Sequence, residues 1–180
     1  YICNHYGLPE VSRYWEKVIE INSWQTKRIS KLVVEKLFGT LSNKKIGILG
    51  FSYKSNTNDT RESPAISICK DLLEEGAILQ IYDPKVSEKQ IRKELEKSDF
   101  VNNKHSSFGN IEISNSVKSA STESDALLIL TEWKEFKTLN WQLISEKMRS
   151  PSWVFDTRSI SNSEEALKFG INVWNIGKGE

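Results

Sequence analysis

The sequence predicts an α/β protein in which helices cover both faces of a parallel sheet and a long connecting helix precedes that sheet. Two observations support this fold class. From residue 45 onward, short apolar runs alternate with amphipathic segments, the pattern of strands joined by crossover helices. Residues 9–38 instead keep one helical spacing throughout. At 180 residues, the chain is long enough to bury a core of its own.

Residues 9–38 are predicted to form one long helix or two nearly continuous ones. Pro9 sits where a helix can begin, and Gly39 sits where one can end. We expect residues 1–43 to be a connecting and dimerisation region and residues 44–180 to form the sheet domain. Apolar side chains recur at helical spacing in both halves of the helix: Val11, Tyr14, Trp15, Val18 and Ile19, then Ile29, Leu32, Val33 and Leu37.

The first strand and the helix after it are marked by strong local signals. IGILGF (46–51) is a short apolar run typical of a buried strand. Ser63 offers an N-cap oxygen and Pro64 fits the first helical position, where its missing N–H costs nothing. Gly76 is expected to end this helix. The apolar stripe of the helix contains Ala65, Ile68, Cys69, Leu72 and Leu73.

The rest of the chain continues the alternation. AILQIYD (77–83) predicts a second strand that an Asp-Pro pair closes. A charged helix is expected at residues 87–97 and a polar surface loop at 98–110. A weak strand is expected at 111–113, and three further strands at 126–130, 152–156 and 171–177. Strands that alternate with helices form parallel sheets with right-handed crossovers, and ligands bind at the carboxyl ends of such strands.

Composition excludes several functional classes. The formal net charge is +1, from 25 basic and 24 acidic residues, and no basic stretch indicates nucleic-acid binding. No apolar run is long enough to span a bilayer and no signal peptide is visible, so no membrane partner is expected. Cys3 and Cys69 form no disulfide framework, which suits a reducing, cytoplasmic setting. The chain starts at Tyr1, and we expect it to be part of a longer protein.

The carboxyl ends of the predicted strands place several polar segments along one edge of the sheet. These are the loop GFSYKSNTNDTRESP (50–64), Asp83, residues 131–133 and residues 156–158. Within the loop, Lys54 and Arg61 bracket a polar run that ends at a helix N-terminus, an arrangement suited to an anion. The competing interpretation is an ordinary surface loop with solvated charges.

The loop departs from the dinucleotide fingerprint G-x-G-x-x-G. Gly47 and Gly50 are present, but the next glycine position of that pattern is Tyr53. The fingerprint also places an acid roughly 20 residues further on, whereas the next acid at a strand end is the more distant Asp83. We therefore expect a Rossmann-like domain that does not itself bind a dinucleotide.

Other reactive side chains offer weaker candidates. Arg158 follows a predicted strand and could pair with a phosphate in bidentate fashion, or equally form a salt bridge to Asp156 or a neighbouring acid. Cys69 lies on an apolar stripe and is expected in the core, and Cys3 beside His5 is not expected to be a nucleophile. The scattered histidines and cysteines predict no metal site.

Taken together, these segments resemble the UDP-glucose/GDP-mannose dehydrogenase family. KKIGILGFSYKSNTNDTRESPAISICKDLLEEGAILQIYDPKV resembles the start of the C-terminal, UDP-binding domain of UDP-glucose 6-dehydrogenases. GLPEVSRYW, TEWKEF and VFDTR fit the same proteins in the same order, so the resemblance spans nearly the whole chain. It implies an NAD-dependent enzyme that oxidises UDP-glucose to UDP-glucuronate with two NAD+ in succession, and that forms a homodimer or higher homo-oligomer through the central helix.

The resemblance also implies roles for individual residues. Tyr53, Lys54 and Arg158 match positions that contact the UDP-sugar, and Arg61 matches an arginine that reaches NAD+ bound mainly by an absent N-terminal domain. The catalytic residues of the family match no position here, so we expect no catalytic residue in this chain and no activity from it alone. Ser55 and Asn56 depart from the Lys and Asp that relatives often carry.

Three alternatives remain open at this point. Within the family, the substrate could be GDP-mannose or a UDP-N-acetylhexosamine instead of UDP-glucose. Outside it, the chain could be a non-catalytic module for nucleotide binding or oligomerisation.

Overall fold

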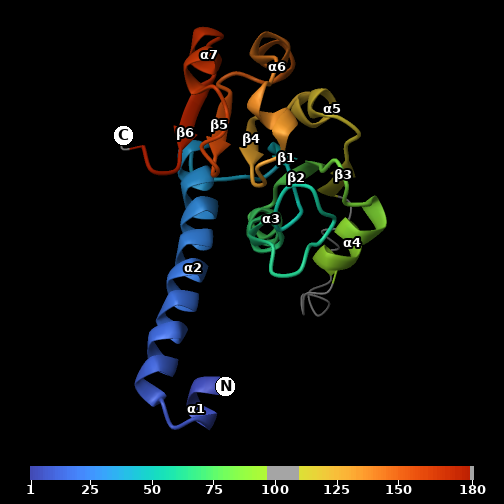
Figure 1. Ribbon diagram of the computed structural model, residues 1–180. Coiled ribbons are helices and arrows are strands. Elements are labelled where there is room, and N and C mark those ends of the chain that lie inside the picture. Colours follow the sequence, from blue (N-terminus) through green and yellow to red (C-terminus); the bar gives the residue numbers. More distant parts are fainter. Residues whose placement is uncertain (97–109, 179–180) are drawn as a thin grey trace.

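The computed structural model describes residues 1–96 and 110–178 and begins with two helices (Figure 1). The short α1 (Ile2–His5) was not predicted, whereas α2 (Pro9–Lys36) confirms the long helix, with its proline in the first turn. The chain leaves α2 through two left-handed residues, Phe38 at φ 67° and Gly39 at φ 79°. That conformation favours glycine and ends the helix.

The two ends of α2 have different surroundings. Near its C-terminus, Ile29 and Val33 are buried in the apolar core that also contains side chains from one face of the sheet. Its N-terminal half extends away from the sheet (Figure 1), and Tyr14, Trp15 and Ile19 are exposed there. The division into a connecting region 1–43 and a domain 44–180 remains a prediction.

The sheet has six parallel strands in the order β3-β2-β1-β4-β5-β6, which is the Rossmann order. The prediction of a Rossmann-like parallel sheet is therefore confirmed, including the weak strand at 111–113. The strands are β1 (Lys45–Leu49), β2 (Ile78–Tyr82), β3 (Ile111–Ile113), β4 (Ala126–Ile129), β5 (Trp153–Asp156) and β6 (Asn172–Asn175).

Helices cover both faces of the sheet, as predicted. One core packs α2, α3 (Pro64–Glu74) and α4 (Glu88–Glu96) against the sheet. The other core holds α5 (Val117–Ser121), α6 (Trp141–Lys147), α7 (Ser163–Lys168) and the 3-10 helix η3 (Lys134–Lys137). In Figure 1, α5, α6 and α7 lie on the side of the sheet away from α3.

The local signals around α3 act as expected. The Ser63 side chain accepts a hydrogen bond from the Ala65 N–H, Pro64 begins the helix, and Gly76 follows its end at φ 84°. The predicted loop 98–110 lies almost wholly outside the described residues. Within the described part of the chain, no helix has both the length and the apolar character needed to cross a membrane.

Candidate ligand site at the carboxyl edge of the sheet

The loops that follow β1, β2, β4 and β5 contact one another at the carboxyl edge of the sheet, as the strand pattern predicted. Thr131, just after β4, donates its hydroxyl hydrogen to the Ser52 carbonyl oxygen over 2.8 Å. Glu132 reaches both the Ser55 amide and Arg158. Residues far apart in the sequence therefore line one site.

Asp83, directly after β2, connects these loops. Its Oδ2 accepts hydrogen bonds from the backbone N–H groups of Phe51 (2.7 Å) and Ser52 (3.0 Å). The indole N–H of Trp133 donates to the same oxygen over 3.2 Å. Buried carboxylates need such donors, because desolvation of an unpaired charge is costly. Asp83 therefore holds the start of the loop against the turn that carries Trp133.

Further hydrogen bonds close the loop between β1 and α3. The Tyr53 N–H donates to the Asp59 carbonyl oxygen over 2.8 Å, which joins the two arms of the loop. From α4, the Gln90 amide donates to the Asn58 carbonyl (2.8 Å) and the Thr60 hydroxyl (3.0 Å). These hydrogen bonds thus give the loop a defined shape.

Two side chains of the loop point outward from this frame. Tyr53 is 51% exposed, and Lys54 is exposed as well. Among the residues that the structure describes, no hydrogen bond or ion pair engages the Lys54 ammonium group. A fixed backbone therefore presents an aromatic ring and the positive charge of Lys54, which also acts on the nearby Asp59 carboxylate, at the ligand edge of the sheet.

Arg61 lies at the far end of the same loop and pairs with Asp59. Its Nε and terminal nitrogen donate to the two carboxylate oxygens over 2.9 and 2.7 Å. These hydrogen bonds lower the pKa of Asp59 to about 2. The Arg61 side chain is nevertheless 87% exposed, so the pair orients the guanidinium group without burying it.

Arg158 lies in the turn after β5 and is held through its Nε atom. That N–H donates to the Leu130 carbonyl oxygen over 2.8 Å, and the same nitrogen lies 3.5 Å from Oε2 of Glu132. Asp156 instead accepts the Arg158 backbone N–H. The salt bridge expected as one alternative therefore exists, and its acid is Glu132.

The linking residues were not predicted to have these roles. The sequence placed Asp83 and Glu132 at the ligand edge, but it gave no sign that their carboxylates hold other loops. Gln90 was not singled out at all. The only available signal for Asp83 was its position, an acid that closes a strand directly before a proline.

The site differs from the usual dinucleotide-binding Rossmann site at three positions: Gly50, Asp83 and Tyr53. A Cβ atom on Gly50 would lie 2.5 Å from the Thr131 Cβ, so the space above this glycine is already filled. The Asp83 carboxylate, which stands where the fingerprint places a ribose ligand, is occupied by N–H donors of the domain itself. Tyr53 stands where that fingerprint needs a glycine.

The cysteines have the positions expected of them. Cys69 is fully buried on α3, and burial raises the pKa of its thiol, which makes the thiolate inaccessible. Cys3 is partly exposed in α1. Within the described ranges, no group of three or more His, Cys, Asp or Glu side chains could hold a metal ion.

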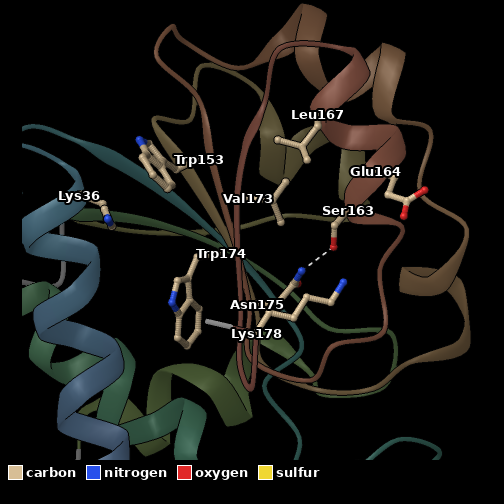
Figure 2. A pocket seen from close by; sticks show the side chains of 9 residues that line it. All are labelled: Lys36, Trp153, Ser163, Glu164, Leu167, Val173, Trp174, Asn175 and Lys178. Atoms are coloured by element: carbon tan, nitrogen blue, oxygen red, sulfur yellow. Dashed lines mark hydrogen bonds between the residues drawn. The ribbon is translucent and has the colours of Figure 1, made fainter. Parts of the chain in front are cut away.

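A separate cavity of about 300 Å³ lies at the β6 edge (Figure 2). Trp153 and Trp174 line it on the side of α2, and Leu167 lines it on the side of α7. A hydrogen bond joins the Asn175 amide to the Ser163 hydroxyl in its wall. None of its lining residues comes from the loops after β1, β2 or β4, so it is distinct from the site that carries Lys54.

Comparison with known proteins identifies the domain. Residues 47–163 match the model of the UDP-glucose/GDP-mannose dehydrogenase family, UDP binding domain. The chain is 43% identical over 178 residues to UDP-glucose 6-dehydrogenase of Drosophila melanogaster and 44% identical over 186 residues to UDP-glucose 6-dehydrogenase 1 of Glycine max. Each alignment covers 99% of this chain but only 37% and 39% of those two proteins.

Solved structures agree on the fold. UDP-glucose dehydrogenase from Pyrobaculum islandicum superposes with a TM-score of 0.68 at 20% identity, over 97% of this chain and 34% of that one. UDP-N-acetyl-mannosamine dehydrogenase from Staphylococcus aureus gives 0.64 at 25% identity, over 94% of this chain and 34% of that one. The family match covers the segment that contains Tyr53, Lys54, Arg61 and Arg158. The chain belongs to the UDP-glucose/GDP-mannose dehydrogenase family and contains its UDP-binding domain.

Proposed function

We propose that this chain is the UDP-sugar-binding part of an NAD-dependent UDP-glucose 6-dehydrogenase, an oxidoreductase that converts UDP-glucose to UDP-glucuronate with two NAD+. One observation carries the proposal: Glu132 contacts both the loop of Lys54, at the Ser55 N–H, and Arg158. This contact lies at the sheet edge where Rossmann-like folds bind ligands. A diphosphate is the ligand that suits cationic side chains in this position. The family match supports the uridine nucleotide.

Three residues would contact the substrate. The Lys54 ammonium group and the Arg158 guanidinium group offer positive charge to the diphosphate, and Tyr53 offers a half-exposed ring to the rest of the nucleotide sugar. This binding energy acts far from the oxidised C6 atom. It serves to hold the sugar in place for the chemistry, which is how enzymes use the non-reacting parts of their substrates.

NAD+ would be held mainly by a part of the enzyme outside this chain. The filled space above Gly50 and the occupied carboxylate of Asp83 argue against a dinucleotide in this domain. Arg61 would contribute one contact from the rim of the site, since its guanidinium group is oriented by Asp59 yet exposed. When bound, NAD+ would accept the hydride from the substrate.

Two relatives described above favour UDP-glucose over the other nucleotide sugars as the substrate. Both the insect and the plant relative are named UDP-glucose 6-dehydrogenase and are at least 43% identical. The protein named for UDP-N-acetyl-mannosamine is only 25% identical. GDP-mannose and UDP-N-acetylhexosamines are therefore the alternative substrates.

A homo-oligomer assembled through α2 is part of the same proposal. The N-terminal half of α2 extends beyond the sheet (Figure 1), and several of its large apolar side chains are exposed. These exposed residues include Val11, Tyr14, Trp15, Ile19, Ile21 and Trp24. Exposed apolar area of this kind favours a protein partner. The two free cysteines support a reducing, cytoplasmic location.

The test compares turnover by the complete protein that contains this chain with turnover by the 180-residue chain. We expect the complete protein to produce NADH from UDP-glucose and NAD+, and to prefer UDP-glucose to GDP-mannose and UDP-N-acetylmannosamine. The chain alone should produce none. A preference for GDP-mannose would contradict the substrate assignment. A complete protein inactive on all three sugars would favour the non-catalytic module.

A further inference from the structure

The carboxylate of Asp83 receives more hydrogen bonds than a strand terminus requires. Besides the donors already described, the Ser52 hydroxyl donates to Oδ2 over 3.2 Å. The other oxygen, Oδ1, accepts the backbone N–H groups of Lys85 and Val86, each over 2.9 Å. Six donors from three segments of the site thus converge on one side chain, which is only 9% exposed.

The partners of Asp83 lie directly before the proposed substrate contacts. Phe51 and Ser52 precede Tyr53 and Lys54 in the chain, and both of their amides point at the carboxylate. The direction of the backbone at these two residues sets where the next two side chains emerge. If this anchor moves, Lys54 moves with it.

From this geometry we infer that Asp83 is a positioning residue for UDP-sugar binding: its carboxylate fixes the backbone that presents Tyr53 and Lys54 to the nucleotide. The inference rests on the proposed function. Asp83 does not contact the substrate, because donors of the protein occupy both of its oxygens. Negative charge is suited to this task, since hydrogen bonds to an ionised acceptor are roughly twice as strong as neutral ones.

Asp125 provides a matched control at the opposite, amino-terminal edge of the sheet. Its carboxylate accepts the backbone N–H of Lys45, the first residue of β1, over 2.8 Å. Asp83 and Asp125 thus anchor the two ends of the same strand region. Only Asp83 lies at the ligand edge. If both aspartates merely stabilised the fold, replacing either one would change the constants for UDP-glucose to the same extent.

The experiment compares Asp83→Asn with Asp125→Asn in the complete enzyme, well below the unfolding temperature. The amide keeps the size of the side chain but removes the charge and turns one acceptor into a donor. For Asp83→Asn we expect the KM for UDP-glucose and the Kd for UDP to rise about tenfold or more, with kcat and the KM for NAD+ changed less than twofold. Asp125→Asn should lower the Tm without changing any of these constants.

A gentler variant covers the case in which Asp83→Asn does not fold. Ser52→Ala removes one donor to the carboxylate and leaves the charge in place, so we expect a rise of roughly two- to fivefold in the KM for UDP-glucose. An unchanged KM in this variant, or equal effects of Asp83→Asn and Asp125→Asn, would overturn the inference.

Lys54→Ala separates this inference from the proposed function. If Lys54→Ala weakens UDP binding while Asp83→Asn does not, the positioning role is wrong and the UDP-sugar assignment stands. If the unaltered enzyme binds no UDP, the proposed function itself is wrong, and the inference is overturned with it.

Discussion

The Nε atom of Arg158 lies 3.5 Å from Oε2 of Glu132. The other oxygen of Glu132 accepts the backbone N–H of Ser55 over 3.4 Å. Through this one carboxylate, the turn after β5 is connected to the residue that follows Lys54. The two cations proposed to hold the diphosphate therefore belong to a single, connected surface.

Replacement of Arg158 by lysine should weaken substrate binding. Lysine keeps the charge but loses the planar fork and the N–H that donates to the Leu130 carbonyl oxygen. We expect the KM for UDP-glucose in the complete enzyme to rise about tenfold. Arg149→Lys is the control, because Arg149 pairs with Asp125 at the other edge of the sheet. Equal KM values for the two variants would contradict a substrate role for Arg158.

The ion pair of Asp59 and Arg61 should respond to acid in a defined direction. Arg61 lowers the pKa of Asp59 from 3.8 to about 2, so the pair favours the folded loop above pH 3.8 and is lost as the pH falls towards 2. Carboxyl-carbon NMR of the chain should give a titration midpoint near this lower value. In Arg61→Ala, the midpoint should return towards 3.8. A midpoint that this substitution leaves unchanged would exclude the pair in solution.

The two thiols should differ in reactivity. Cys69 is buried and its pKa is raised by desolvation, whereas Cys3 is partly exposed. An aromatic disulfide reagent should modify Cys3 in the folded chain and Cys69 only after unfolding. Cys3→Ser should therefore show no rapid reaction until denaturant is added. Rapid labelling of folded Cys3→Ser would place Cys69 outside the core.

The exposed face of α2 should control assembly. Trp15 and Ile19 lie one helical turn apart and are both exposed. We expect the double substitution Trp15→Lys and Ile19→Lys to reduce the mass of the complete enzyme by light scattering, because charged side chains resist burial in an interface. Glu146→Lys on α6 introduces the same side chain elsewhere and should leave the mass unchanged. Retention of the full mass by the double variant would locate the interface elsewhere.

The sequence was sufficient to predict the sheet and the long helix because each has a strong periodic signal. The run at 46–51 and the stripe of α3 are local patterns that a strand and a helix must show. The helices α5, α6 and α7 were not predicted individually. They have only 5, 7 and 6 residues, too few for a helical period to emerge.

The site was predictable in outline but not in its connections. The rule that ligands bind at the carboxyl ends of parallel strands brought Lys54, Asp83 and Arg158 to one edge. The contact between Ser55 and Glu132 joins residues 77 positions apart, and it depends on side-chain rotamers that no local pattern encodes. For the same reason, the donors to Asp83 could be identified only from the structure.

The most direct test of the central claim is a calorimetric titration of the complete enzyme with UDP, comparing Lys54→Ala with Lys118→Ala. Within the described residues, the Lys54 ammonium group makes no hydrogen bond or ion pair, so its removal should leave the loop intact. We expect Lys54→Ala to raise the Kd for UDP about tenfold or more. Lys118, exposed on α5, should have no effect when replaced. An unchanged Kd in Lys54→Ala would contradict the assignment of this loop to the UDP-sugar.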